Sequence, residues 1–142
     1  MSQCLGRILI VDDFEPWRGA VRSMLDGKFQ IVGEAGGGFD AVTKAQALEA
    51  NLILLDIGLP DMDGIEAGRK ILENSPGAKV IFVTANSDCE LMRTALGIGA
   101  MGYVLKADAG RELLKAIDAV LHGERFVSRR VIGNDPARSD SG

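Results

Sequence analysis

The chain has 142 residues and a mass of 15.1 kDa, the size of one ordinary domain, with little room for a second folded module. Apolar residues make up 46% and charged residues 25%, a balance typical of a folded protein rather than a disordered one. The net charge of -4 gives no general attraction to nucleic acid, and no apolar run approaches the roughly 20 residues that cross a bilayer.

Five short apolar runs recur at regular intervals along the chain. They are mostly rich in β-branched residues and lack polar alternation, and they lie at 8–11, 31–32, 52–55, 80–83 and 103–105. Such runs are typical of strands that are buried on both faces, as in a parallel sheet.

Between and after these runs, apolar residues recur with a helical period. The five predicted faces contain Trp17, Val21, Met24 and Leu25; Ala41, Val42, Ala45 and Leu48; Ile65, Gly68, Ile71 and Leu72; Leu91, Met92, Ala95 and Leu96; and Leu113, Leu114, Ile117, Val120 and Leu121. Pro16 favours the start of the first helix and Gly123 the end of the last. Strands alternating with helices predict right-handed βαβ crossovers and one doubly wound α/β sheet of five strands and five helices.

Polar side chains stand where four of the predicted strands end. The first ends in Asp12-Asp13, the third in Asp56, the fourth in Thr84 and the fifth in Lys106. In an open α/β sheet, ligands bind at the carboxyl ends of the strands. Three carboxylates this close repel one another unless a cation neutralises them, and oxygen ligands favour Mg²⁺. Any one of these residues alone is also typical of a cap or a loop, but their convergence predicts a site for a phosphoryl group beside a divalent ion.

Four segments carry a resemblance to a known family: ILIVDD (8–13), LILLDIGLPDMDGIE (52–66), VIFVTA (80–85) and GAMGYVLKADAGRELLKAI (99–117). They resemble the receiver domain of bacterial two-component response regulators, and are most similar to its NarL/FixJ (LuxR-type) branch. The resemblance covers residues 6–127 and implies a flavodoxin-like sheet with strand order 2-1-3-4-5. Residues 128–142 are expected to form a flexible tail or the start of an interdomain linker.

The resemblance implies a role for each residue of the predicted site. Asp56 would be the phospho-acceptor, attacking the phosphohistidine of a partner kinase. Asp13 would bind Mg²⁺ or Mn²⁺ directly and Asp12 largely through water, joined by the Asp56 carboxylate and the backbone carbonyl of Gly58. Lys106 would pair with a phosphoryl oxygen.

Two further residues, Thr84 and Tyr103, are implied to form the switch. Thr84 would donate to another phosphoryl oxygen and shift toward it, and Tyr103 would then turn inward. The resemblance thus implies a signalling switch, phosphorylated by a sensor histidine kinase, that changes the surface of its fourth helix, fifth strand and fifth helix. A homodimer formed on phosphorylation is a further hypothesis. DNA would be bound to regulate transcription only through a C-terminal helix-turn-helix domain that is not in these residues.

Two other functions compete with this interpretation. A Mg²⁺-dependent phosphohydrolase of the haloacid-dehalogenase type also uses a strand-end Asp, but it needs a second acid two residues later, where this chain has Gly58, and an insertion that forms a substrate cap. A flavodoxin-like flavin binder needs a Ser/Thr/Gly phosphate loop after the first strand, where Asp12-Asp13 would repel a phosphate. We therefore expect a signalling domain that catalyses only its own phosphorylation and dephosphorylation, not an enzyme.

Features outside the site have simpler interpretations. Gly36-Gly37-Gly38 lacks the spacing of a nucleotide fingerprint and predicts a flexible turn between a strand and a helix. Trp17 is expected to pack into the core; the alternative is that it lies near enough to the acidic pair to report Mg²⁺ by fluorescence. Cys4 and Cys89 form neither a disulfide framework nor a metal cluster. Residues 1–6 show no secretory signal, so we expect a cytoplasmic protein with no membrane partner.

Overall fold

Strands and helices alternate along residues 6–133, the part of the chain that the computed structural model describes. In chain order the elements are β1 (Arg7–Val11), α1 (Glu15–Leu25), β2 (Gln30–Ala35), α2 (Gly38–Ala47), β3 (Leu52–Leu55), α3 (Gly64–Asn74), β4 (Lys79–Thr84), α4 (Cys89–Gly97), β5 (Gly102–Leu105), the 3₁₀ helix η2 (Lys106–Asp108), α5 (Ala109–Leu121), β6 (Phe126–Val127) and α6 (Arg129–Gly133). The strands pair in parallel in the order β2-β1-β3-β4-β5-β6. The predicted α/β class and order 2-1-3-4-5 are confirmed, and β6 adds a short sixth strand beside β5.

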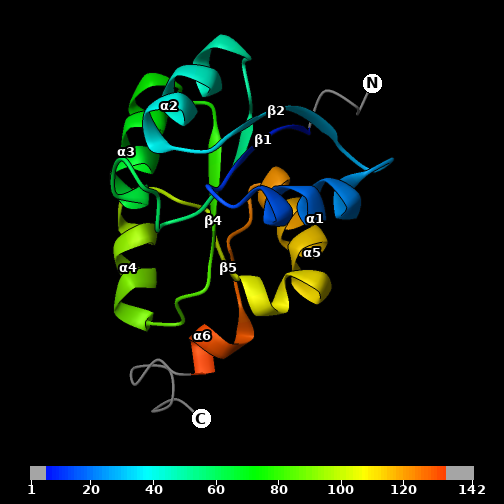
Figure 1. The fold of residues 1–142 in the computed structure, drawn as a ribbon. Coiled ribbons are helices and arrows are strands. Elements are labelled where there is room, and N and C mark those ends of the chain that lie inside the picture. The colour runs from blue at the N-terminus through cyan, green and yellow to red at the C-terminus, as the bar shows by residue number, and fades with distance from the viewer. Residues whose placement is uncertain (1–5, 134–142) are drawn as a thin grey trace.

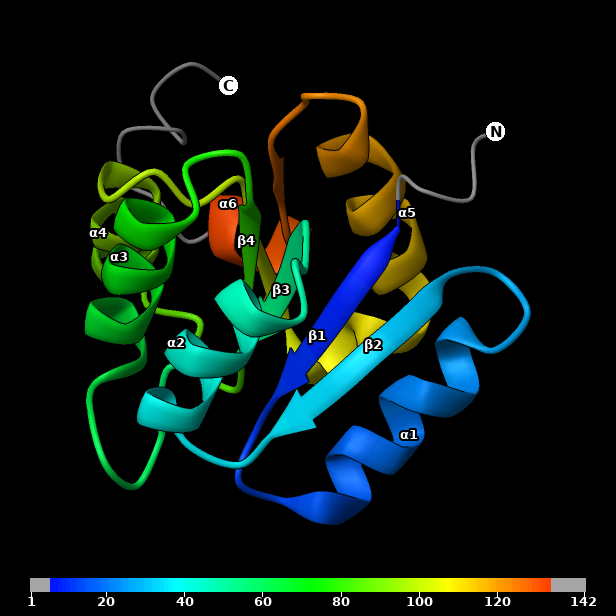
Figure 2. The same cartoon turned by 90° about the horizontal axis from the view of Figure 1, so that it is seen from above.

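Helices cover both faces of the sheet. Helices α2, α3 and α4 lie on one side, and α1 and α5 lie on the other (Figures 1 and 2). Successive strand residues alternate between these two layers: Leu9 and Val11 belong to the core on the α2–α4 side, whereas Ile8 and Ile10 belong to the core on the α1–α5 side. Because each face of β1 is buried under helices, its sequence is a continuous apolar run. No helix within residues 6–133 has the length and apolar character needed to cross a membrane.

Two helices that begin at the carboxyl edge of the sheet are capped by carboxylates. The side chain of Asp63 accepts a hydrogen bond from the amide of Ile65 at the start of α3, and Asp88 accepts one from Glu90 at the start of α4. These side chains satisfy amides that have no partner inside the helix. Asp63 and Asp88 therefore have structural roles, which separates them from the carboxylates at the strand ends.

The end of the described chain is more ordered than the sequence indicates. β6 pairs with β5, and α6 packs near α4 with Val131 fully buried. The Ser128 hydroxyl accepts a hydrogen bond from the amide of Leu105 at 2.9 Å. Part of the predicted flexible tail, residues 129–133, is thus a helix packed on the domain, while residues 134–142 and Cys4 lie outside the described residues. The boundary at residue 127 stays a prediction.

Candidate functional site

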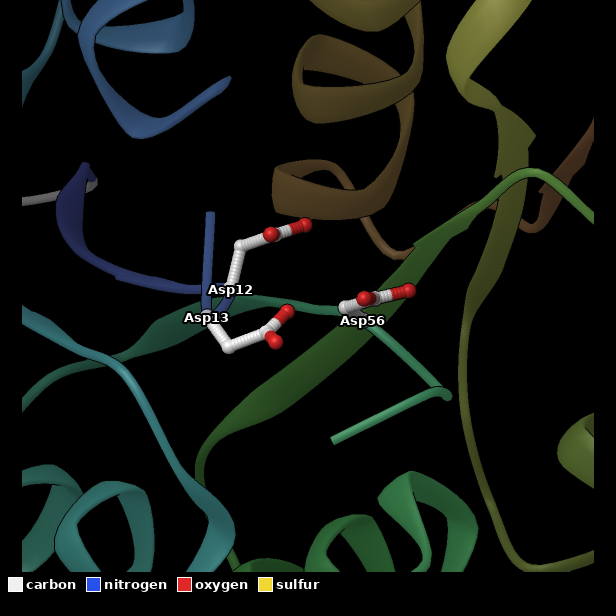
Figure 3. Close-up of side chains that lie close together, drawn as sticks. All are labelled: Asp12, Asp13 and Asp56. Carbon is white, nitrogen blue, oxygen red and sulfur yellow. The ribbon is translucent and has the colours of Figure 1, made fainter. Parts of the chain in front are cut away.

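The predicted polar residues do meet at the carboxyl edge of the sheet. Asp12 and Asp13 follow β1 and Asp56 follows β3, and Figure 3 shows their side chains close together with the carboxylates pointing to the same side. One carboxylate oxygen from each of the three lies within 4.8 Å of those of the other two. Thr84 ends β4 and Lys106 follows β5, and both line the pocket that contains Asp56. The structure therefore brings together all five side chains that the strand-end argument selected.

Asp12 is the most deeply buried carboxylate of this cluster, with an exposed fraction of 1%. Its Oδ1 atom accepts a hydrogen bond from the amide of Phe14 at 2.9 Å. Its Oδ2 atom lies 2.6 Å from the ammonium of Lys106, which pairs with its charge. A buried carboxylate that stands beside two further carboxylates, with one ammonium as counter-charge, fits a cation ligand.

The Asp56 carboxyl has a raised pKa, and burial is the main cause. The nearby charge of Asp12 raises the pKa further, whereas the ammonium of Lys106, 3.7 Å away, lowers it. The amides of Gly58 and Ile57 also lower it by hydrogen bonding. The net shift shows that this carboxylate carries its charge at a cost, which a bound cation would relieve.

The pocket beside Asp56 is open to solvent and has a volume of about 630 Å³. It is lined by residues at or just after the ends of β3, β4 and β5, by the loop between β4 and α4, and by α4 itself: Asp56, Ile57, Gly58, Thr84, Ala85, Asn86, Ser87, Leu91 and Lys106. Gly58 is exposed, and a Cβ built there would meet no atom of the described chain within 4 Å. The mouth of the pocket is therefore not closed at this position.

A backbone link between Thr84 and Tyr103 was not foreseen from the sequence. The hydroxyl of Thr84 accepts a hydrogen bond from the amide of Asn86 at 3.2 Å, and the hydroxyl of Tyr103 donates to the carbonyl of Asn86 at 2.7 Å. Tyr103 is fully buried, so its ring already lies inward here. Asn86 thus joins the two residues implied to form the switch, and a shift of one can reach the other through the backbone of this one residue.

Tyr103 should ionise only at very alkaline pH, because burial, with a smaller contribution from Asp88, raises its pKa to about 12. Its unfolded pKa is about 10, so its contribution to stability is complete below pH ~10 and is lost as the pH rises toward 12. Tyr103 is the single tyrosine of the chain, so tyrosinate absorbance reports it alone. Reversible ionisation near pH ~10 in the folded protein would contradict a buried ring.

The turn after β2 contacts the loop after β3, which the sequence did not reveal. The carboxylate of Asp61 accepts hydrogen bonds from the amides of Gly38 at 2.7 Å and Phe39 at 3.1 Å, which lowers the pKa of Asp61. A Cβ on Gly38 would lie 2.2 Å from the Cγ atom of Met62. The glycines therefore permit a close approach between two loops, and the loop that follows Asp56 is tied to α2. Three consecutive glycines before a helix were the only signal of it.

The model of the response regulator receiver domain family matches residues 8–118. This chain belongs to that family. Among the relatives of this receiver domain, response regulator GacA of Pseudomonas viridiflava is 35% identical over 128 residues, which are 88% of this chain and 59% of GacA. Response regulator UvrY of Escherichia coli (strain K12) is 33% identical over 123 residues, 85% of this chain and 56% of UvrY. The chain thus spans less than three fifths of the length of these curated relatives.

Solved structures give the same family. A LuxR-family two-component response regulator from Aurantimonas sp. SI85-9A1 superposes on this receiver domain with a TM-score of 0.88 and 28% identity, covering 96% of this chain and 98% of that one. The receiver domain of the putative response regulator NarL from Mycobacterium tuberculosis gives a TM-score of 0.77 and 30% identity over 84% of this chain and 98% of that one. The predicted family and its NarL/FixJ (LuxR-type) branch are confirmed.

Proposed function

We propose that this receiver domain is a phosphorylation-dependent switch in which Asp56 accepts a phosphoryl group from the phosphohistidine of a sensor histidine kinase. The observation that carries the proposal is the shared pocket of Asp56, Thr84 and Lys106. A carboxylate that must act as a nucleophile needs an ammonium and a hydroxyl donor where negative charge gathers on the phosphoryl oxygens. Asp56 has both at the edge of its own pocket.

The transfer assigns a separate task to each of these side chains. A carboxylate oxygen of Asp56 attacks phosphorus, the phosphorus–nitrogen bond breaks, and the electron pair of that bond leaves with the histidine nitrogen. Lys106 lies 3.7 Å from Asp56, close enough to pair with a phosphoryl oxygen once the group is attached. The hydroxyl of Thr84 donates a hydrogen bond to another phosphoryl oxygen. A hydroxyl can donate and accept at once, so Thr84 can still accept the hydrogen bond from the amide of Asn86, or lose that bond if its side chain moves.

The carboxylate cluster fits Mg²⁺ or Mn²⁺ as the cofactor. Asp13, Asp56 and the backbone carbonyl of Gly58 would bind the ion directly, and Asp12 largely through water. The donor set contains oxygen atoms only, and three carboxylates offer oxygen atoms within 4.8 Å of one another, which supports a hard cation here. When bound, the ion would neutralise charge on the carboxylates and on the transferring group.

Phosphorylation would change the surface formed by α4, β5 and α5, and this surface would contact the next partner in the signalling pathway. The link from Thr84 through Asn86 to Tyr103 supports this change, because Tyr103 lies on β5 and Asn86 lies just before α4. β6 pairs with Gly102 and Tyr103 of β5, so a second copy cannot pair with that part of the strand while β6 is in place. Homodimerisation on phosphorylation would use the helices of this surface.

The relatives extend well beyond the length of this chain. GacA and UvrY are response regulators, and this chain matches less than three fifths of each. We infer that the receiver domain regulates transcription through a C-terminal helix-turn-helix output domain, which would make the DNA contact. The net charge of -4 supports the view that these residues themselves are not the DNA-binding part.

Incubation with acetyl phosphate should add one phosphoryl group per chain, only when Mg²⁺ is present, and intact mass measures it. Asp13→Asn should lower Mg²⁺ affinity and the rate of uptake by about 100-fold, because it removes a charged ligand from an exposed position of the cluster. Asp26→Asn is the matched control, since Asp26 is exposed at the far end of α1 and should leave both unchanged.

Other outcomes of this assay would support the competing functions. Repeated turnover of a stable phosphate ester would favour a phosphohydrolase, and a yellow chromophore in the purified protein would favour a flavin binder. A folded, Mg²⁺-loaded protein that no small phosphodonor or kinase modifies would contradict the switch.

A further inference from the structure

The ammonium of Lys106 lies among three groups, one of which is aromatic. Two are carboxylates, Asp12 at 2.6 Å and Asp56 at 3.7 Å. The third is the indole ring of Trp17, whose centroid lies 5.4 Å from Nζ. The side chain of Lys106 keeps an exposed fraction of 25%, so water reaches it from the pocket side.

The path of the chain explains why Trp17 can reach Lys106. α1 begins just after Asp12-Asp13, so a residue in its first turn stands at the carboxyl edge of the sheet. Lys106 begins η2, which leads into α5, and α1 and α5 lie side by side on the same face of the sheet (Figure 1). Trp17 is partly buried against the core on that face, as the sequence predicted.

We propose that Trp17 is a positioning residue for Lys106, a role that rests on the proposed function of the pocket. A cation within about 6 Å of an aromatic centroid is attracted by the negative face of the ring, and tryptophan gives the strongest attraction. The ring attracts the ammonium from α1, and the two carboxylates attract it from the ends of β1 and β3. A flexible four-carbon stem is thus held with its charge beside Asp56.

This arrangement matters because the carboxylates alone do not aim the ammonium at the phosphoryl pocket. The contact with Asp12 is 1.1 Å shorter than the contact with Asp56 (3.7 minus 2.6 Å), and it draws Lys106 toward the buried end of the cluster. Once a cation occupies the cluster, the attraction of Asp12 for Lys106 weakens. The ring is uncharged and does not weaken in this way, so it would keep Lys106 in reach of a phosphoryl oxygen.

The first experiment uses the metal-free protein and does not depend on phosphorylation. Because Nζ lies over the ring, 5.4 Å from its centroid, we expect the NMR resonance of the protons on the adjacent carbon to be shifted upfield by the ring current. The resonance is identified by its loss in Lys106→Arg. The upfield shift should disappear in Trp17→Leu, which keeps apolar bulk, and persist in part in Trp17→Tyr, which keeps an aromatic face.

The second experiment measures the rate of phosphoryl uptake from acetyl phosphate at saturating Mg²⁺. Trp17→Leu should lower this rate about two- to fivefold, the range expected from the loss of one partly exposed cation–π contact, and Trp17→Tyr should restore most of it. Met24→Ala is the matched control, because Met24 lies on the same helix and packs against the same core. It should lower stability without changing the Lys106 resonance or the rate.

Three results would overturn the proposal. These are a Lys106 resonance without an upfield shift in the wild type, an unchanged rate in a folded Trp17→Leu protein, or an equal loss of rate in Met24→Ala. If Trp17→Leu does not fold, Trp17→Met takes its place, with the same loss of the upfield shift and of rate expected. A wild type that takes up no phosphoryl group would refute the function of the pocket, while the resonance would still decide whether the ring holds Lys106.

Discussion

Asp56→Asn should abolish phosphoryl uptake and, in the same protein without metal, raise the thermal stability at neutral pH. Uptake stops because an amide is not a nucleophile for phosphorus, whereas stability rises because a costly charge is removed. Burial and the neighbouring charge of Asp12 hold the pKa of Asp56 above its ordinary value. The fold therefore favours the protonated carboxyl, which is the neutral form.

The effect of Asp56 on stability should depend on pH, because its carboxyl has a higher pKa in the folded chain than in the unfolded chain. Because the folded pKa lies above the unfolded pKa, the folded state binds more protons between the two values, and stability falls as the pH rises through that window. Above this pH window, the ionised Asp56 carboxylate lowers the free energy of unfolding by a constant amount. Below the window, the carboxyl is protonated in both states and no longer lowers it. The difference in melting temperature between Asp56→Asn and the wild type should thus be largest at neutral pH and vanish in acid.

Metal should reverse the order of the two proteins. A ligand that binds only the folded state stabilises it, and by about 2.7 kcal/mol at one hundred times its dissociation constant. Mg²⁺ should therefore stabilise the wild type, and should stabilise Asp56→Asn less because one charged ligand is gone. Asp26→Asn, the exposed control, should follow the wild type throughout. A metal-free Asp56→Asn protein that melts below the wild type at neutral pH would show that Asp56 is a stabilising charge.

The polar site at the strand ends could be predicted from the sequence, because its position follows from where the strands end. Continuous apolar runs such as Ile8–Val11 identify strands buried on both faces, and parallel strands bring their carboxyl ends to one edge. Once the strands are placed, Asp12, Asp56 and Lys106 must lie near one another, whatever the details of the loops. The structure accordingly has the predicted strand order and the predicted cluster of carboxylates.

Contacts between loops were not readable, because a single hydrogen bond to a backbone group leaves no periodic pattern. Asp61 looks like any loop carboxylate in the sequence, yet it caps the amides of α2. The same is true of Tyr103, whose hydroxyl finds the carbonyl of Asn86 from a residue 17 positions away. β6 and α6 escaped notice because they are 2 and 5 residues long, too short to show any repeat.

Gly64 packs directly against the backbone that carries Asp56. It is buried at the first position of α3, and its amide donates to the carbonyl of Ile57 at 2.8 Å. A Cβ there would lie 2.2 Å from the carbonyl oxygen of Asp56 and 2.4 Å from the Cα atom of Ile57. These are backbone atoms, so no change of side-chain rotamer relieves the clash. Helix α3 or the segment that carries Asp56 must move instead.

Gly64→Ala should therefore destabilise the protein by roughly 3 kcal/mol, at the upper end of the cost of overpacking, as measured by urea unfolding. The fraction that stays folded should also take up phosphoryl groups more slowly, because displacement of the Asp56 backbone moves the nucleophile relative to Lys106 and Thr84. Gly97→Ala is the matched control. Gly97 ends α4, is exposed, and has open space at the Cβ position, so alanine there should be neutral or stabilising by up to about 1 kcal/mol. If Gly64→Ala matched Gly97→Ala in stability and in rate, the α3 terminus would not be what holds the Asp56 backbone in place.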